Sequence, residues 1–125
     1  MLIKYLLMQK IPDRSPAVIL SSLFQTLSVP PRLEILLAIG DSEACVCHLE
    51  AALGYRQAYI SQHLMALREA GLLEARREGR FIYYRLAEQR ILDVLKLAGE
   101  MSGAPVELHP IHLFSCKCPN CEVTS

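Results

Sequence analysis

Apolar residues recur at intervals of three and four over most of this sequence, the spacing that gathers them on one face of a helix. Prolines, which favour a first helical turn, stand at the start of the first two such segments. Glycines, which favour a helix end, follow the next ones. The pattern predicts helices over residues 16–28, 31–39, 45–53, 57–70 and 88–102.

Between residues 73 and 86 the period changes from 3.6 to 2. Before a turn at Glu78-Gly79, every second residue lies on one face, at Leu73, Ala75 and Arg77. After the turn the same alternation continues at Ile82, Tyr84 and Leu86. This predicts a two-stranded hairpin. Two short helices joined at 54–56 and followed by a hairpin are the order of a winged helix-turn-helix.

The predicted fold is therefore mainly α with a small β-hairpin, a winged helix-turn-helix of about five to six helices. We expect residues 1–102 to form a DNA-binding and dimerisation domain and residues 103–125 to form a cysteine-containing tail. The helix at 88–102 has a broad apolar face, although the preceding elements already supply the core. This predicts that the face packs against a second subunit.

Charge is distributed unevenly. The formal net charge is zero, but residues 56–85 hold six arginines against three acidic residues. A local basic strip of this kind favours contacts to DNA phosphates when two copies act together.

The helix at 57–70 is the predicted DNA-reading element, because its first turn presents polar side chains while Ile60, Leu64 and Leu67 face inward. Arg56 stands where a helix start usually has Ser, Thr, Asp or Asn, and a cation there opposes the helix dipole, which suggests a phosphate contact. Ordinary solvated polar residues are the competing interpretation. The candidate DNA-binding residues are Arg56, Gln57, Ala58, Tyr59, Ser61, Gln62, His63, Arg76, Arg77 and Arg80. His63 lies beside the apolar stripe, so its default interpretation is a hydrogen-bonded structural histidine.

Five cysteines form two tight clusters, an arrangement unlike a secreted disulfide framework. A Cys-x-Cys pair is a poor disulfide and a good chelate for a thiophilic ion. The competing interpretation is that one of the pair is a small buried hydrophobe. The candidate metal ligands are Cys45, Cys47, Cys116, Cys118 and Cys121. The apolar opening at residues 1–8 is too short for a membrane span and lacks a signal cleavage site, so we expect a cytoplasmic protein without a membrane partner.

Four successive segments resemble the ArsR/SmtB family of metal-sensing repressors over roughly residues 17–102. The box at 43–49 is similar to the family's Glu-Leu-Cys-Val-Cys-Asp-Leu, and residues 57–64 are similar to its recognition helix. Residues 67–73 and the hairpin at 76–86 match as well. His48 departs from the family's Asp, and the helix at 88–102 has no histidine for the family's zinc site there.

The resemblance implies a homodimer, formed through the first and last helices, that represses its operator DNA when metal-free and releases it when metal binds. The expected effector is As(III), or Sb(III), held by thiolates, with no organic cofactor and no enzymatic activity. A Cd(II), Pb(II) or Zn(II) sensor, a thiol-redox-sensing repressor, a thiol enzyme and a constitutive DNA-binding protein with a metal-storing tail are the alternatives. The third thiolate for As(III) is expected from the tail, from the same or the partner chain.

Overall fold

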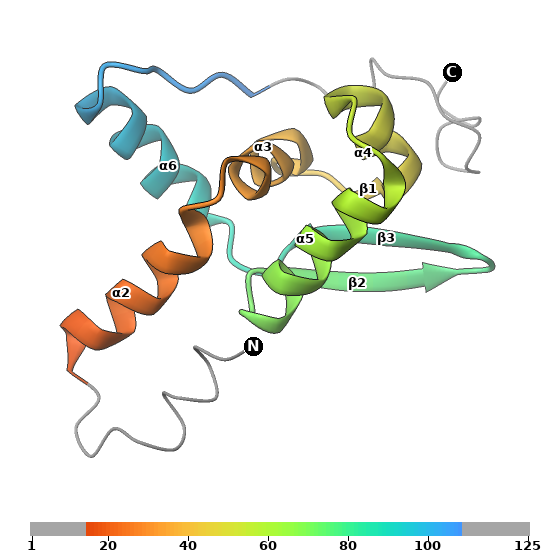
Figure 1. The fold of residues 1–125 in the computed structure, drawn as a ribbon, viewed down its shortest axis with the longest axis horizontal. Coiled ribbons are helices and arrows are strands. Elements are labelled where there is room, and N and C mark those ends of the chain that lie inside the picture. Colours follow the sequence, from red (N-terminus) through yellow and green to blue (C-terminus); the bar gives the residue numbers. More distant parts are fainter. Residues whose placement is uncertain (1–14, 109–125) are drawn as a thin grey trace.

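The computed structural model describes residues 15–108, and this part of the chain contains five helices and a small antiparallel sheet. The elements follow one another as α2 Pro16–Leu27, α3 Pro30–Ile39, β1 Ala44–Cys45, α4 Val46–Leu53, α5 Gln57–Glu69, β2 Leu73–Glu78, β3 Phe81–Leu86 and α6 Arg90–Met101 (Figure 1). The predicted winged helix-turn-helix is confirmed, with each predicted helix present to within two residues at either end. The hairpin β2–β3 is the wing.

Local sequence explains where the helices begin and end. The Ser15 side chain accepts the backbone N–H of Val18 at 3.4 Å and Pro16 follows in the first turn, so α2 begins there. Gly54 ends α4 in the left-handed conformation with φ 79°, which a residue with a Cβ adopts only with strain. This turn leads the chain through Arg56 directly into α5.

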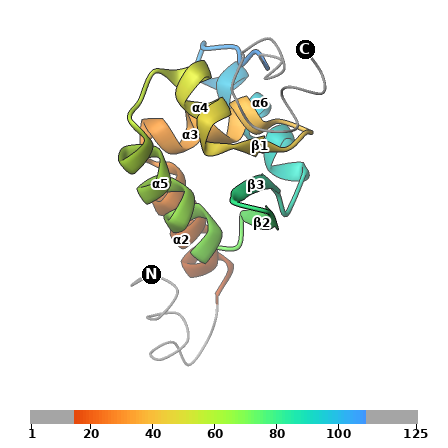
Figure 2. The same ribbon diagram turned by 90° about the vertical axis from the view of Figure 1, so that its right-hand side faces the viewer.

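The core lies where α3, α4 and α5 pack against one another and against one face of the sheet (Figure 2). Its centre is fully buried and consists of aliphatic side chains from all three helices, namely Ile35, Leu36, Leu49, Ile60, Leu64 and Leu67. The predicted inward stripe of α5 is thereby confirmed.

The sheet differs from the predicted two-stranded hairpin because a third strand joins it. Cys45 was expected in the first turn of a helix, but Ala44 and Cys45 form β1, which pairs with Tyr84 and Tyr83 of β3 to give the order β1-β3-β2. Cys45 is then the residue that caps α4. Two residues are too short to show a strand period. The turn of the wing also lies one residue later than predicted, at Gly79 and Arg80.

The sheet has two different faces. One face packs on the main core. The cross-strand pairs place four core residues on it, namely Ala44, Leu73, Tyr84 and Leu86. We call the opposite side the outer face. There Cys45 and Tyr83 form a separate small cluster with Cys47 and Phe81 packed against it.

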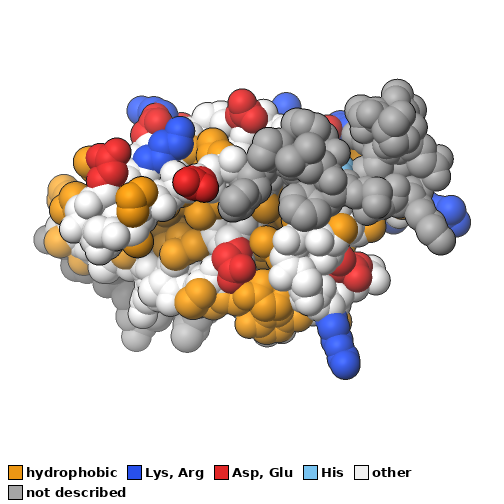
Figure 3. Space-filling view, turned by 90° about the horizontal axis from the view of Figure 1, so that it is seen from above, with side chains coloured by type: hydrophobic (Ala, Val, Ile, Leu, Met, Phe, Trp, Pro, Cys, Tyr) orange, Lys and Arg blue, Asp and Glu red, His pale blue; other side chains and the backbone are white. Residues whose placement is uncertain are grey.

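Helices α2 and α6 lie at the end of the molecule opposite the tip of the wing (Figure 1). Seen from above, hydrophobic side chains are exposed at that end and also at the lower middle of the view (Figure 3). Among the described helices, none is long and apolar enough to cross a membrane.

Candidate DNA interface and thiol pair

Helix α5 presents the predicted polar residues on its solvent side. Gln57, Ala58 and Gln62 are exposed, Ser61 is half-buried, and Met65 also points outward with 62% of its surface exposed. No acidic side chain occupies the first turn of α5. An exposed amphipathic helix with amide side chains near its start has the geometry of a helix that enters the major groove.

Arg56 caps α5 without a side-chain hydrogen bond to the helix. Its backbone carbonyl accepts the N–H of Ile60 at 3.0 Å, while the side chain is exposed. Within residues 15–108 it forms no ion pair. The structure therefore places a guanidinium at the helix start, where it is available to an external anion.

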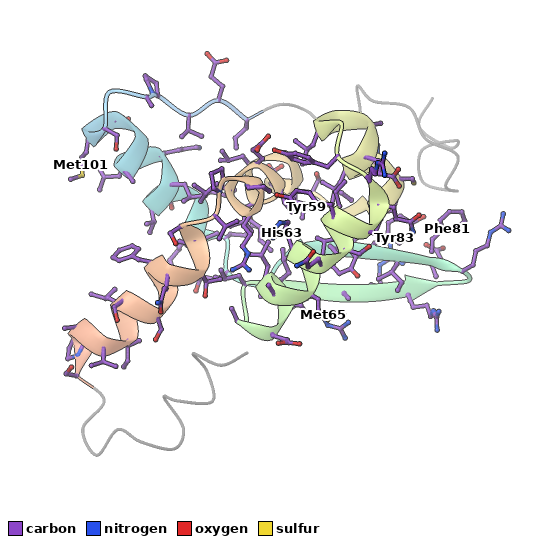
Figure 4. The ribbon with its side chains drawn as sticks, in the orientation of Figure 1. Tyr59, His63, Met65, Phe81, Tyr83 and Met101 are labelled. Atoms are coloured by element: carbon purple, nitrogen blue, oxygen red, sulfur yellow. The ribbon has the colours of Figure 1, made fainter. Side chains whose placement is uncertain are left out.

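Tyr59 and His63 lie on the side of α5 that faces α3 rather than on its solvent face (Figure 4). The Tyr59 ring packs edge-on against His63 at 4.6 Å between centroids and against Tyr55 at 5.1 Å. Tyr59 remains 41% exposed, so it borders the reading face. Tyr55 in turn donates a hydrogen bond of 2.6 Å to Glu34 of α3.

His63, one of the DNA-binding candidates, is among the buried residues of α5. It is 7% exposed, and its Nδ1 accepts a hydrogen bond from Arg32 Nε at 3.3 Å. Burial, and next the positive charge of Arg32, lower the pKa of His63. The neutral ring thus ties α5 to α3, as the structural interpretation predicted.

The three wing arginines differ in their surroundings. Arg76 bonds Glu43 at 2.8 and 3.2 Å and Glu78 at 3.1 Å, so its charge is already compensated. Arg77 and Arg80 are exposed and form no ion pair in the described part of the chain, although Arg80 lies 5.4 Å from the Phe81 ring centre. The wing therefore offers Arg77 and Arg80 to a phosphate more readily than Arg76.

Cys45 and Cys47 are brought together at the junction of β1 and α4. Cys45 is 2% exposed, Cys47 is half-buried, and neither is in a disulfide. A cleft of about 340 Å³ beside them reaches both the reading helix and the wing; its lining includes Cys45, Cys47, Gln57, Ser61, Arg80 and Phe81. A ligand held by the two sulfurs would thus border elements predicted to hold DNA.

The described residues provide two sulfur donors but no complete metal site. Within residues 15–108 no group of three or more His, Cys, Asp or Glu side chains is placed to hold a metal ion. The other candidate ligands, Cys116, Cys118 and Cys121, lie outside the described residues, as does the apolar opening at 1–8. Soft thiolates bind thiophilic ions such as As(III). As(III) needs three thiolates, so Cys45 and Cys47 supply only part of such a site.

Sequence reasoning missed the residues that connect the thiols to the wing. Tyr83 is 1% exposed on the outer face, and Glu43 is the main partner of Arg76. The strand period assigned Tyr83 to the solvent side, because β1 and the two cysteines that cover it were not recognised as neighbours. Only the Cys45↔Tyr83 pairing reveals it.

A winged helix-turn-helix with an exposed reading helix and a basic wing defines a DNA-binding transcriptional regulator. Residues 30–75 match the family described as "Bacterial regulatory protein, arsR family". The chain is 37% identical over 93 residues to the HTH-type transcriptional repressor SmtB of Mycobacterium tuberculosis, an alignment covering 71% of this chain and 69% of that protein. It is 46% identical over 66 residues to the arsenical resistance operon repressor of Escherichia coli, covering 52% of this chain and 56% of that one.

A solved structure shows the same architecture. The homodimeric winged helix-turn-helix DNA-binding domain of a possible ArsR-family regulator from Mycobacterium bovis superposes with a TM-score of 0.64 at 30% identity, covering 76% of this chain and 90% of that one. The chain belongs to the ArsR family of transcriptional repressors, which are not enzymes.

Proposed function

We propose that this protein is a homodimeric repressor that holds operator DNA when metal-free and releases it when thiolates bind As(III). The supporting observation is the position of the thiol pair: Cys45 lies in a strand of the same sheet that forms the wing, and both cysteines border a cleft that reaches α5. A relative named for arsenical resistance is 46% identical to this chain over 66 residues.

The DNA interface in this proposal consists of the start of α5 and the tip of the wing. Gln57, Ala58, Ser61 and Gln62 read bases, with Tyr59 at the border. Arg56, Arg77 and Arg80 contact phosphates. Because no acidic side chain lies in the first turn of α5, its partial positive charge adds to the attraction for the DNA backbone.

The dimer in this proposal forms through α2 and α6. Their exposed large side chains are unusual for a surface that stays in water; they are Ile19, Leu20, Phe24, Val94, Leu97 and Met101. Met101, 81% exposed, lies at the far end of α6 from the wing (Figure 4). Association through this end leaves both reading helices uncovered.

As(III) binds three thiolates, so Cys45 and Cys47 would hold it together with one tail cysteine. The chemistry that the ion supplies is a covalent link between sulfurs that are otherwise independent. Cys45 is almost completely buried, so its sulfur becomes available only when its neighbours move. Ion binding is thereby linked to a change in the protein.

The test uses a DNA duplex selected from a randomised pool by the metal-free, reduced protein. Arsenite, cadmium and zinc are titrated separately into the complex while fluorescence anisotropy reports release. We expect release at about one or two arsenite per dimer, and a coupling between the two ligands of about 5- to 150-fold, the range typical of allosteric proteins.

Cysteine variants then assign the ligands. Cys45→Ser and Cys47→Ser should bind DNA normally and fail to respond to arsenite, whereas Cys116→Ser, Cys118→Ser and Cys121→Ser identify the third ligand. Full response of the Cys45 and Cys47 variants would refute the assignment. Release by cadmium or zinc alone would indicate a four-ligand site, and release by peroxide alone a redox sensor.

A further inference from the structure

Three side chains form a row across the outer face of the sheet, one from each strand. Cys45 of β1 is the cross-strand partner of Tyr83 in β3, and Tyr83 is the partner of Arg76 in β2. The Arg76 guanidinium carbon lies 4.8 Å from the centre of the Tyr83 ring. The thiol that would bind an ion is therefore separated from a wing arginine by a single aromatic ring.

An ion pair also connects Arg76 to the segment that carries the thiols. Arg76 donates two hydrogen bonds to Glu43, which lies two residues before Cys45, and a third to Glu78 within the wing. We call Glu43, Arg76 and Tyr83 together the latch.

We propose that Arg76 is a positioning residue that couples the thiol pair to the wing, and not a contact to the DNA backbone. The proposal rests on the function proposed above, in which an ion binds Cys45 and Cys47. It identifies the wing, through β1 and β3, as the route by which ion binding weakens DNA binding.

The mechanism follows from burial. Cys45 and Tyr83 are 2% and 1% exposed and pack together, so an ion that draws the Cys45 sulfur toward Cys47 also shifts Tyr83. A shift of Tyr83 removes the support beneath Arg76, and movement of the Cys45 segment displaces Glu43 at the same time. Arg77 on β2 and Arg80 in the turn between the two strands that the latch holds then lose their position for phosphate contacts at both half-sites.

Two measurements separate a latch from a phosphate contact. A lost phosphate contact reduces the slope of log affinity against log salt concentration by about 1 per subunit. A lost coupling residue instead reduces the ratio of DNA affinities without and with arsenite, by about 2- to 30-fold for residues on a coupling route. Arg76→Gln, Glu43→Gln and the matched control Arg77→Gln are compared with wild type on the same selected duplex.

We expect Arg77→Gln to reduce the salt slope and keep the wild-type arsenite ratio. Arg76→Gln and Glu43→Gln should keep the slope and reduce the ratio, and the double variant should reduce it no further than either single one. Thermal melts and arsenite binding measured by thiolate absorbance, without DNA, show that each variant folds and holds the ion. Glu43→Gln keeps the test valid if Arg76→Gln fails to fold.

The outcomes that contradict the latch are distinct from those that contradict the function. A reduced salt slope with a full arsenite ratio in Arg76→Gln would make Arg76 a phosphate contact. Full ratios in both Arg76→Gln and Glu43→Gln, with a responsive wild type, would refute the latch alone. A wild type that no ion releases would refute the sensor function, and the coupling role of Arg76 with it.

Discussion

Truncation of Phe24 tests whether α2 contributes to a subunit interface. Phe24 is 52% exposed although it is a large aromatic residue. An aromatic side chain buries roughly 200 Å², so about 100 Å² of its surface remains to be covered by a partner. At about 25 cal/mol per Å² this is worth about 2.5 kcal/mol per protomer. A symmetric dimer contains the substitution twice, so Phe24→Ala should weaken association by about 4–5 kcal/mol, or roughly a thousandfold or more in the dimer dissociation constant.

Sedimentation equilibrium over a range of protein concentrations measures this constant directly. Met65→Ala is the matched control, because Met65 is 62% exposed but lies on the solvent side of α5, so its truncation should leave association unchanged. Anisotropy with the selected duplex should show weaker and more concentration-dependent DNA binding for Phe24→Ala. An unchanged dimer constant in Phe24→Ala, with the fold intact, would show that Phe24 is outside the interface.

Three further predictions concern stability. Leu64→Ala truncates a fully buried residue and should lower the free energy of unfolding by about 2–5 kcal/mol in a denaturant titration; a loss below 1 kcal/mol would contradict its central place in the core. Burial lowers the pKa of His63 from its usual value of 6.5, so its contribution to stability is complete above about pH 6.5 and is lost as the pH falls toward its folded pKa. The melting temperature should therefore fall less between pH 7.5 and pH 5.5 in His63→Gln than in the wild type. An equal fall in both proteins would contradict this. A Cβ at Gly99 would lie 2.7 Å from the Ala104 carbonyl oxygen and 2.8 Å from Val106 Cγ2, so Gly99→Ala should displace the 104–106 segment and speed its proteolysis, with unchanged cleavage the contrary result.

The helices and the wing could be predicted because their signals are local. The spacing of Ile60, Leu64 and Leu67 alone determines which face of α5 is buried, and all three are fully buried in the structure. Gly54 and Gly79 mark turns because both have positive φ, at 79° and 62°. Such features depend on neighbours within a few positions, so one sequence suffices to find them.

The features that were missed depend on pairs that are distant in sequence. Arg76 and Glu43 are 33 positions apart, and Arg32 and His63 are 31 apart. An arginine in a basic hairpin suggests a phosphate contact until the carboxylate opposite it is known. A histidine beside an apolar stripe remains ambiguous until the helix that covers it is placed.

The position of the thiols on the outer face suits a switch better than a position in the main core. The main core holds α3, α4, α5 and the inner face of the sheet together, so an ion there would separate elements on which folding depends. Cys45 and Tyr83 instead form a separate cluster, with Cys47 and Phe81 packed against it. Such a satellite cluster opens at a smaller free-energy cost than the core. Its link through Arg76 still reaches both strands of the wing, so a small local opening has a direct effect on the proposed DNA interface.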